Sequence, residues 1–307
     1  MQPLHIETPL FESRAMSHHA GREVWLKMEA MQPPGSFKIR GIGLACQEYA
    51  RRGAKRFISS SGGNAGIAVA YAGRHLSVPV VVVVPETTTD RAKALIRQEG
   101  AEVLVHGASW FEANELATSM LEASDAFLHP FDDPFVWQGH ASMIDEVARS
   151  GARPAAVVLS VGGGGLFCGV VDGLHRNGWS DVPVLAVETE GADSFAQSVH
   201  AGHRVELDGI SSIATSLGAT KICEQAFTWS QKHPVLSAVV TDAAAVAGCL
   251  RFIEDQRVVV EPACGASLAA VYDRAPELEE FDSVLIVVCG GVTVTVDKLR
   301  AWSRELE

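Results

Sequence analysis

The sequence predicts an α/β protein built on parallel β-sheets, and three observations support this fold class. Short runs of apolar, β-branched residues recur along the chain. These runs are continuously apolar rather than alternating with polar residues, which is typical of parallel strands covered on both faces. Ala-rich segments with helical periodicity lie between them, so that strand and helix alternate.

The individual elements follow in chain order. The predicted strands are residues 56–61, 78–85, 101–106, 155–161, 182–188 and 283–290. The predicted helices are residues 64–76, 90–100, 111–123 and 140–150.

The first three strands and the last three look like two separate sheets, and residues 129–142 are the expected return crossing between them. The length of 307 residues is enough for about two domains. We therefore expect a large, discontinuous domain of residues 1–39 and 135–307 and a small domain of residues 40–134.

Composition excludes several classes of function. The formal net charge is −12 and no Lys/Arg-rich block is present, which argues against nucleic acid or an anionic membrane surface as partner. The N-terminal residues lack the pattern of a signal peptide, and no apolar run approaches the ~18 residues that span a bilayer. We therefore expect a soluble, cytoplasmic protein.

The six cysteines are scattered singly, without any CxxC spacing. A disulfide framework or a zinc site is therefore not indicated. The default interpretation of each cysteine is a small buried hydrophobic residue. The cysteines are Cys46, Cys168, Cys223, Cys249, Cys264 and Cys289.

Three predicted strands end directly in glycine-rich turns, at residues 59–66, 160–169 and 288–295. In open α/β sheets, ligands gather at the carboxyl ends of the strands. We therefore expect the three turns to face one cleft.

The turn Gly162–Gly165 precedes a helix-like stretch, "LFCGVVDGL". Glycines at a helix N-terminus let successive backbone N–H groups converge on an anion, which favours a phosphate-binding turn. The pattern is neither a Walker loop nor G-x-G-x-x-G. The alternative is a tight turn that needs glycine only for space.

The turn "SSSGGNAG" (59–66) is of the same type but carries hydroxyls and an amide. The hydroxyls of Ser59, Ser60 and Ser61 and the N–H groups of the following helix could hold a carboxylate, and Asn64 could hydrogen-bond an oxygen on a ring. The alternative is ordinary helix capping by Ser or Asn.

The stretch "PPGSFKIRG" (33–41) holds Lys38 between two apolar residues at the start of a helix. Alone, Lys38 would most simply extend its ammonium to water, with Ser36 as the helix cap. A lone lysine, a phosphate-binding turn and a Ser/Asn turn together meet the needs of pyridoxal phosphate, which requires a lysine, an anion site and a partner for its ring nitrogen.

Six motifs carry a family resemblance: "GSFKIRG", "SSGGNAGIAVAYA", "FDDP", "SVGGGGL", "EPACGA" and "VCGG". In this order they resemble the fold type II, tryptophan-synthase-β-like, pyridoxal phosphate enzymes. Within these the chain is most similar to the L-serine dehydratase/L-threonine deaminase group. The resemblance implies two three-layer domains with parallel sheets and the cofactor cleft between them, and a homodimer.

The resemblance also implies roles for individual residues. Lys38 resembles the Schiff-base lysine, and Phe37 a residue that packs on the cofactor ring. Cys289 falls where the family places a hydroxyl or thiol beside the pyridine nitrogen. The matching phosphate loop is Gly162, Gly163, Gly164 and Gly165. The matching substrate-carboxylate loop is Ser61, Gly62, Asn64 and Ala65, of which Asn64 also resembles the partner of the cofactor's 3′-oxygen.

A monovalent-cation site, for which K⁺ is a candidate, is implied in the same way. The matching ligands are Glu188 and oxygens of Gly162, Ala192, Ser194, Leu217 and Ala219. The alternative for Glu188 is a partly exposed glutamate at a strand end. Three positions depart from the usual family residues: Gly62, Ser216 and "CGGVTVT". Gly62 bears on the fit of the substrate and so on efficiency and the choice between serine and threonine, whereas "CGGVTVT" in place of the more usual "CGGSN" removes polar groups near the ring nitrogen.

The function implied is β-elimination: L-serine would give pyruvate and ammonia, and L-threonine would give 2-oxobutyrate. Lys38 would act as the base at Cα. Serine racemisation or β-replacement on the same scaffold is the nearest alternative, and a non-catalytic phosphate-binding protein is a remote one.

Overall fold

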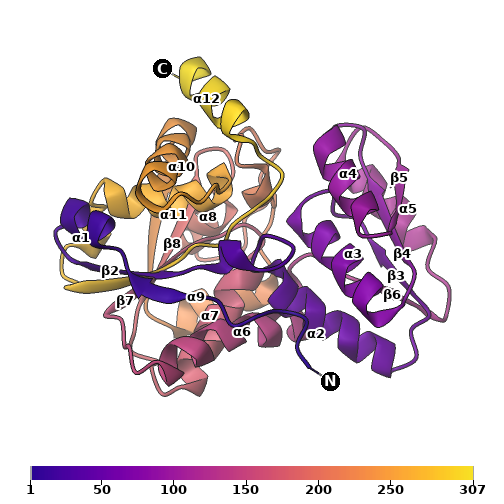
Figure 1. The fold of residues 1–307 in the computed structure, drawn as a ribbon, viewed down its shortest axis with the longest axis horizontal. Coiled ribbons are helices and arrows are strands. Elements are labelled where there is room, and N and C mark those ends of the chain that lie inside the picture. Colours follow the sequence, from indigo (N-terminus) through magenta and orange to yellow (C-terminus); the bar gives the residue numbers. More distant parts are fainter. Residues whose placement is uncertain (1, 307) are drawn as a thin grey trace. The chain divides into compact units, whose positions relative to one another are not determined.

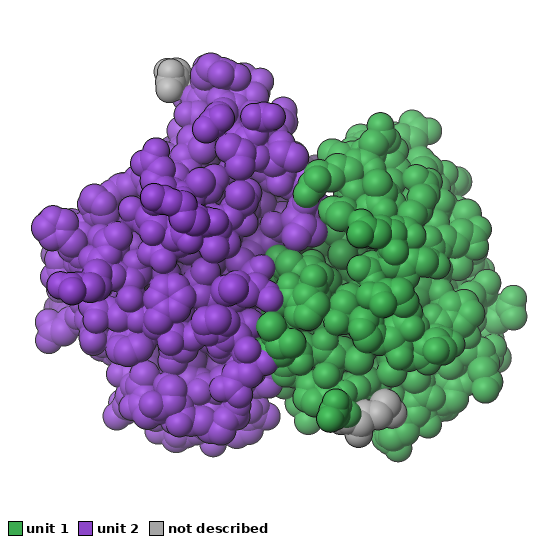
Figure 2. All heavy atoms as spheres, in the orientation of Figure 1, with its two compact units in different colours: residues 1–6, 32–140 green, residues 7–31, 141–307 purple. Residues whose placement is uncertain are grey.

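The computed structural model describes residues 2–306, which form two compact units (Figure 1, Figure 2). Unit 1 consists of the residues up to Ile6 together with Gln32–His140. Unit 2 consists of Glu7–Met31 together with the residues from Ala141 onward. Unit 1 thus takes in the residues up to Ile6 and residues 32–39 and 135–140, all of which the predicted domains had assigned to the larger part. The assignment of a cofactor-binding domain stays a prediction.

Unit 1 contains a four-stranded sheet in the order β5-β4-β3-β6, in which every pairing is parallel. Its strands are β3 (Arg56–Ser59), β4 (Val80–Val84), β5 (Glu102–Val105) and β6 (Asp125–Phe127). Its helices are α2 (Lys38–Arg51), α3 (Asn64–Leu76), α4 (Asp90–Gln98) and α5 (Trp110–Ser119), and α6 (Pro134–Arg149) begins in this unit.

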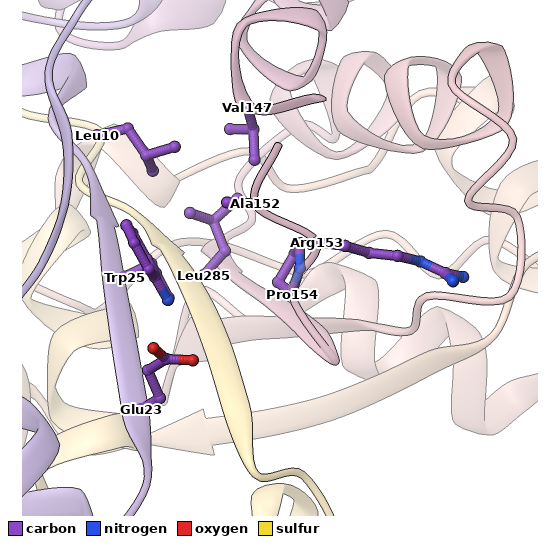
Figure 3. A pocket seen from close by; sticks show the side chains of 8 residues that line it. All are labelled: Leu10, Glu23, Trp25, Val147, Ala152, Arg153, Pro154 and Leu285. Atoms are coloured by element: carbon purple, nitrogen blue, oxygen red, sulfur yellow. The ribbon is translucent and has the colours of Figure 1, made fainter. Parts of the chain in front are cut away.

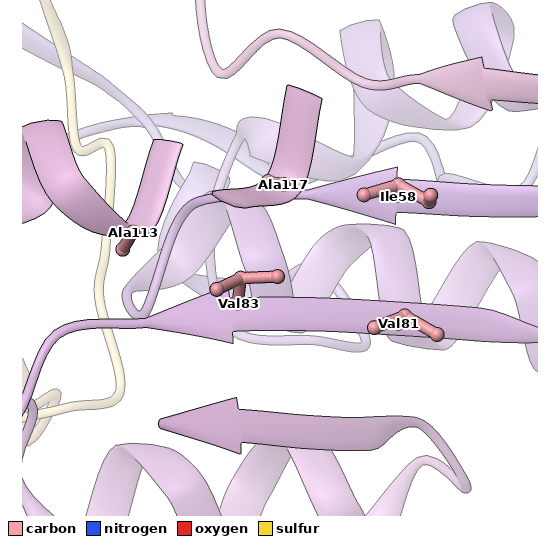
Figure 4. Close-up of a cluster of buried hydrophobic side chains, with 5 residues drawn as sticks. All are labelled: Ile58, Val81, Val83, Ala113 and Ala117. Atoms are coloured by element: carbon pink, nitrogen blue, oxygen red, sulfur yellow. The ribbon is translucent and has the colours of Figure 1, made fainter. Parts of the chain in front are cut away.

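Both faces of this sheet are covered, because alternate side chains of β4 meet different helices. Val81 and Val83 pack with Ala113 and Ala117 of α5 and with Ile58 of β3 (Figure 4). On the other face, glycines of α3 bring that helix so close that a Cβ at Gly66 would lie 3.2 Å from Cγ1 of Val82. Unit 1 is therefore a three-layer structure, as a continuously apolar strand requires.

Unit 2 contains a six-stranded sheet in the order β1-β2-β10-β7-β8-β9. Only β1 runs antiparallel to its neighbour. Its strands are β1 (Leu10–Glu12), β2 (Glu23–Lys27), β7 (Ala156–Ser160), β8 (Val184–Thr189), β9 (Val235–Val240) and β10 (Ser283–Val287).

The helices of unit 2 lie on both faces of its sheet; α10 and α11 are on one side, and α6 and α7 on the other (Figure 1). Close helix packing uses glycine here too, since a Cβ at Gly265 of α11 would lie 2.1 Å from the carbonyl oxygen of Ala245 in α10. The helices are α1 (Arg14–Ala20), α7 (Gly165–Arg176), α8 (Ser194–Ala201), α9 (Glu224–Lys232), α10 (Asp242–Gln256), α11 (Pro262–Tyr272) and α12 (Val296–Glu305). The 3₁₀ turns are η1 (Glu29–Met31), η2 (Thr215–Leu217) and η3 (Pro276–Leu278).

The predicted fold class, α/β with parallel sheets, is confirmed, and all six predicted strands are present. The strand predicted over 283–290 ends at Val287, so Cys289 lies in the turn that follows. The return crossing predicted over 129–142 contains the first half of α6. Four strands were not predicted: β1, β2, β6 and β9.

The parallel pairing places the glycine-rich turns at the carboxyl edges of the sheets. In unit 2, β10 and β7 are neighbours, so the turn that holds Cys289 and the turn Gly162–Gly165 leave the same edge from adjacent strands. In unit 1, the turn that begins after Ser59 leaves the carboxyl end of β3. Among residues 2–306, no helix is long and apolar enough to cross a membrane.

A cavity of about 110 Å³ lies at the opposite edge of the unit 2 sheet (Figure 3). Glu23 and Trp25 of β2, Leu285 of β10 and Arg153 before β7 line it. Because these residues lie toward the amino ends of the strands, the cavity is separate from the glycine-rich turns.

Candidate active site

Lys38 is the first residue of α2, and its ammonium is directed back to the sheet of unit 1. The side chain is half-buried, and Nζ donates a hydrogen bond to the carbonyl oxygen of Pro130 at 2.6 Å. Pro130 follows β6, whose continuation stays beside β3, since Leu128 N donates to Ile58 O at 2.8 Å. The ammonium therefore lies at the carboxyl edge of this sheet, where the Ser59–Gly63 turn begins, and does not simply extend to water.

The residues just before Lys38 differ from the simple capping pattern. The N-cap of α2 is Phe37, and no side chain of the described residues caps it. Ser36, the cap expected in the alternative interpretation, has a buried hydroxyl with no hydrogen-bond partner among residues 2–306. A buried, unpaired hydroxyl is costly in a closed protein core and suits a site that receives a polar ligand.

Phe37 packs on His140 with ring centroids 4.8 Å apart. His140 is completely buried, and neither ring nitrogen has a hydrogen-bond partner among the described residues. Burial, followed by the nearby positive charge of Lys38, holds the pKa of His140 well below its usual value. The ring beneath Phe37 is therefore neutral. Contact of Phe37 with a cofactor ring stays a prediction.

The helix that follows the Ser/Asn turn of unit 1 begins without a side-chain cap from any described residue. The N-cap of α3 is Gly63, and none of the side chains in the described chain caps the helix. The expected alternative, capping by Ser or Asn, is therefore wrong. Ser60 donates to Asn114 Oδ1 at 2.8 Å, and Ser61 Oγ accepts from Gly63 N at 3.4 Å. Asn64 and Ala65 are the buried first residues of α3.

Gly62 departs from the usual residue of the resembling family, and its surroundings explain the glycine. A Cβ at this position would lie 2.7 Å from Oγ1 of Thr88 and 3.2 Å from Cγ1 of Val84. Thr88 thus occupies the space that a larger residue at position 62 would need.

The turn Gly162–Gly165 joins β7 to α7 and is packed tightly from behind. Gly164 has φ +94°, which only glycine adopts without strain, and a Cβ there would lie 2.4 Å from Cβ of Ala226. A Cβ at Gly162 would lie 3.0 Å from Cα of Leu217. Neighbouring atoms therefore leave no room for a side chain at Gly162 or Gly164. The alternative interpretation, that the turn needs glycine for space, is correct for these two residues.

The same turn also fits a phosphate. No side chain in residues 2–306 caps the N-terminus of α7, which leaves the first N–H groups of a twelve-residue helix for a ligand. Its glycines place no Cβ between those N–H groups and an anion, and the helix end carries partial positive charge. A tight turn and a phosphate-binding turn are therefore compatible interpretations. Packing on one side fixes the backbone, and the N–H groups on the other side stay available for an anion.

Cys289 follows β10 and is buried, with 7% of its surface exposed. A hydrogen bond with the thiol of Cys264, together with burial and the nearby carboxyl of Glu261, raises the pKa of Cys289 well above its usual value. The thiol is therefore neutral at physiological pH. A neutral group fits the predicted place beside a pyridine nitrogen, because it does not hold that nitrogen protonated as a carboxylate would.

Glu261 was not assigned a role from the sequence, although it begins the quoted motif "EPACGA". It is 4% exposed, and Thr293 Oγ1 donates to its Oε2 at 3.0 Å. Its carboxyl also fills the space beside Gly291, where a Cβ would lie 2.1 Å from Cδ of Glu261. The buried carboxyl thus fixes the turn that carries Cys289.

Glu188 lies in β8 and is completely buried, so the alternative of a partly exposed glutamate is wrong. Its oxygens accept from Phe195 N at 2.9 Å and Ala196 N at 2.7 Å, at the start of α8. Burial nevertheless outweighs these hydrogen bonds and raises the pKa of Glu188 to about 8.

The other predicted cation ligands lie in segments that contact one another. Ser194 Oγ donates to Ala219 O at 2.8 Å, and Ala219 N donates to Leu217 O at 2.7 Å. Ala192 closes a short bridge with Thr189 at the end of β8. Each carbonyl oxygen keeps a second lone pair, so the set could bind a monovalent cation, but cation binding stays a prediction.

Unit 1 supplies the Lys38 amine and a helix start that no described side chain caps, and unit 2 supplies a second such helix start and the buried, neutral thiol of Cys289. This set of groups fits pyridoxal phosphate. Comparison with known proteins agrees: the sequence profile of the pyridoxal-phosphate dependent enzymes matches residues 1–290, and the chain belongs to this family.

Individual relatives narrow the comparison. The chain is 45% identical to an L-serine dehydratase/L-threonine deaminase of Homo sapiens, over 99% of this chain and 96% of the relative. A fungal L-serine ammonia-lyase from Rhizomucor miehei has the same fold with a TM-score of 0.95 at 34% identity, and the match covers 100% of both chains. A maize serine racemase matches with a TM-score of 0.87 at 25% identity, over 99% of this chain and 94% of that one. The resemblance inferred from six short motifs is thereby confirmed.

Proposed function

We propose that this protein is a pyridoxal-phosphate dependent ammonia-lyase that converts L-serine to pyruvate and ammonia, and L-threonine to 2-oxobutyrate and ammonia. The observation that carries the proposal is the match, over nearly the whole of both chains, to a relative named L-serine dehydratase/L-threonine deaminase. The half-buried amine of Lys38, directed at a sheet edge, supports it from the structure.

Lys38 has the central role in this proposal. When bound, pyridoxal phosphate supplies an electron-withdrawing ring that makes the Cα proton of an amino acid acidic. Lys38 would hold the cofactor through Nζ, and the free amine of Lys38 would serve as the base that takes the proton from Cα of the substrate. The carbonyl of Pro130 orients the Lys38 amine through the hydrogen bond described above.

The two uncapped helix starts divide the anionic groups between them. We assign the cofactor phosphate to Gly162, Gly163, Gly164 and Gly165, where only backbone donors are present. We assign the substrate carboxylate to Ser61, Gly62, Asn64 and Ala65, where a hydroxyl joins the backbone donors of α3. Asn64 would also hydrogen-bond the 3′-oxygen of the cofactor.

Cys289 is proposed as the neighbour of the pyridine nitrogen. Its neutral thiol would leave that nitrogen unprotonated, so negative charge at Cα would be held only briefly. A hydroxyl on the adjacent carbon would then leave before other reactions of the Cα carbanion could occur, which favours elimination over transamination.

Three further assignments extend the proposal. K⁺ would be bound by Glu188 with oxygens of Gly162, Ala192, Ser194, Leu217 and Ala219. By analogy with the resembling family we also expect a homodimer, and from the sequence we expect a cytoplasmic location. Turnover with and without K⁺, together with a solution mass measurement, would test the first two.

The decisive experiment uses Lys38→Ala. The wild-type protein should form pyruvate from L-serine, and borohydride should fix the cofactor onto Lys38, as peptide mapping by mass spectrometry would show. The variant should lose about 10³-fold or more in turnover because it lacks the base. Lys55→Ala, at an exposed lysine of the same unit, is the matched control and should keep both properties. Full pyruvate formation by Lys38→Ala would refute the assignment.

Serine racemisation is the second candidate, favoured by the maize serine racemase match. It needs an acid or base on the other side of the substrate Cα, for which the Ser61 hydroxyl is the available group in its turn. Incubation of L-serine in deuterated water separates the two: deuterium in recovered D-serine without pyruvate would identify a racemase, and pyruvate with little D-serine would identify the lyase.

A further inference from the structure

Two cysteines far apart in the sequence lie together behind the turn Gly162–Gly165. Cys168 is in the first turns of α7, and Cys223 is the N-cap of α9. Their sulfur atoms are 3.9 Å apart, and their residues are 0% and 2% exposed. Neither cysteine takes part in the proposed elimination.

Both cysteines hold the turn through their backbones. Cys168 N donates to Gly164 O at 2.9 Å, and Cys223 N donates to Gly163 O at 3.0 Å. The carbonyl groups of Gly163 and Gly164, which are consecutive in the turn, are therefore hydrogen-bonded to the backbones of the two cysteines whose thiols are in contact. A change in the separation of Cys168 and Cys223 must act on the turn from both sides.

The turn has little freedom to absorb such a change. A Cβ on Gly164 would lie 2.4 Å from Cβ of Ala226 and 3.4 Å from Sγ of Cys223. The first turn of α9 thus contacts the glycine directly. Close-packed interiors transmit small displacements instead of absorbing them.

We propose that Cys168 and Cys223 form a redox-sensitive dithiol, and that its oxidation to a disulfide weakens binding of the cofactor phosphate at Gly162–Gly165. The effect on the phosphate rests on the proposed function of that turn. The formation of the disulfide depends only on the position of the two sulfur atoms.

The oxidant is a peroxide. One thiolate attacks a peroxide oxygen, the O–O bond breaks, and a sulfenic acid and one water form; the second thiol then displaces the hydroxyl as a second water while the S–S bond forms. Two electrons and two protons pass from the thiols to hydrogen peroxide. Cys223 is the expected attacking thiol, because the N-terminal end of a helix stabilises a thiolate.

The disulfide requires the sulfur atoms to approach from 3.9 Å to about 2.0 Å. Part of this movement must come from the α9 start, since Cys168 lies within α7. Gly163 O accepts a hydrogen bond from the backbone of Cys223, the N-cap of α9. When the start of α9 moves, the Gly163 carbonyl and its peptide plane rotate with it. The N–H groups that face the phosphate then lose their alignment. Burial of both thiols makes the reaction depend on local opening of α9, so we expect it to be slow.

The test measures the disulfide and cofactor affinity separately on the full-length apoprotein. After prolonged peroxide treatment, peptide mapping should find Cys168 linked to Cys223 with the loss of two hydrogen atoms. Titration with pyridoxal phosphate, monitored by the absorbance of the cofactor, should show an affinity about tenfold lower than in the reduced protein. This is the loss expected if the oxidised turn has its phosphate-binding conformation about one tenth of the time. A dithiol reductant should restore it.

Matched variants assign the effect. Cys168→Ser and Cys223→Ser should each change affinity by less than about twofold on oxidation, relative to their own reduced forms. Cys46→Ser, a buried cysteine of unit 1, should respond like the wild type. Mapping also separates this pair from Cys264 and Cys289, whose thiols are hydrogen-bonded to each other.

Three results would overturn the inference: no Cys168–Cys223 linkage, a linkage with unchanged affinity, or an equal loss of affinity in Cys223→Ser. Failure of the proposed function looks different. In that case the reduced wild-type protein would not bind pyridoxal phosphate, while the disulfide could still form.

Discussion

The strands β7 and β3 each lead through a glycine-containing turn into an uncapped helix, but the two turns are built differently. In unit 2 the turn Gly162–Gly165 has only backbone groups, and one glycine has φ +94°. In unit 1 the corresponding turn carries serine hydroxyls, and its N-cap Gly63 has φ −108°. The first turn is fixed by packing behind it, whereas a Cβ at Gly63 would meet nothing within 4 Å.

This difference is the basis for assigning two different anions to the two turns in the proposed function. In both units the helix starts without a side-chain cap from the described residues, and a helix N-terminus attracts negative charge. In the proposed function, the glycines packed against α9 would give a rigid site for a permanently bound phosphate. An open N-cap flanked by hydroxyls suits a substrate carboxylate, which must enter and leave.

Among variants of the two turns, Gly164→Ala should have the largest effect. The new Cβ would require strained backbone at φ +94° and would collide with Ala226, so we expect the free energy of unfolding to fall by about 1–3 kcal/mol. Because the turn must move to admit the methyl group, pyridoxal phosphate affinity should fall at least about tenfold. Denaturant unfolding and absorbance titration measure the two quantities.

Gly178→Ala is the matched control for this variant. Gly178 also has positive φ, at +75°, but nothing lies within 4 Å of its Cβ position. It follows the other end of α7. The control should lose stability through backbone strain but keep cofactor affinity. Normal affinity in Gly164→Ala would remove Gly162–Gly165 as the phosphate turn.

Much of this arrangement was predictable from local sequence. The run Val80–Val84 is buried along its whole length, as continuous apolarity indicates. The strand β2, "EVWLK", was missed because it mixes charged and apolar residues. It can still lie inside the sheet because Lys27, 1% exposed, is neutralised by Glu146 at 2.5 Å. That partner is 119 residues away, beyond the reach of any local pattern.

The candidate site was predictable to a similar extent. Lys38 and the glycine turns were found because each carries a short motif, and their combination pointed to one cofactor. The single cysteines were interpreted as small buried hydrophobic residues, and all six are indeed buried. The sequence could not indicate that Cys168 and Cys223 meet, because 55 residues separate them and only the packing of α9 on α7 joins them. The role of Glu261 was missed for the same reason.

The next effect concerns Glu188, on the strand beside β7. Its pKa in the folded protein is about 8, above the ordinary value of 4.5. Between these values the folded state keeps a proton that the unfolded state releases. The contribution of Glu188 to stability is therefore full below pH 4.5 and is lost as pH rises to about 8, on the order of a few kcal/mol. Urea unfolding at several pH values, without K⁺, measures this slope.

Glu188→Gln provides the control, since glutamine cannot titrate and should remove this part of the slope. If K⁺ binds the ionised carboxylate, adding K⁺ should raise stability at pH 8 in the wild type but not in the variant. An unchanged slope in Glu188→Gln would show that another group titrates. An equal response of both proteins to K⁺ would exclude Glu188 as a ligand.

The smallest effect is expected from Gly63→Ser, which would give α3 of unit 1 a side-chain cap at its N-terminus. Serine fits the observed backbone, and its hydroxyl would cap α3 by accepting from an N–H group of the first turn, raising stability by a few tenths of a kcal/mol. Those donors would then be unavailable to a carboxylate, so KM for L-serine should rise several-fold, by roughly the value of one hydrogen bond. Gly63→Ala adds a Cβ without an acceptor and should leave KM near that of wild type. If Gly63→Ser instead weakened pyridoxal phosphate binding and left KM unchanged, the unit 1 turn would bind the phosphate and not the carboxylate. The division between a rigid phosphate site in unit 2 and an open carboxylate site in unit 1 would then be wrong.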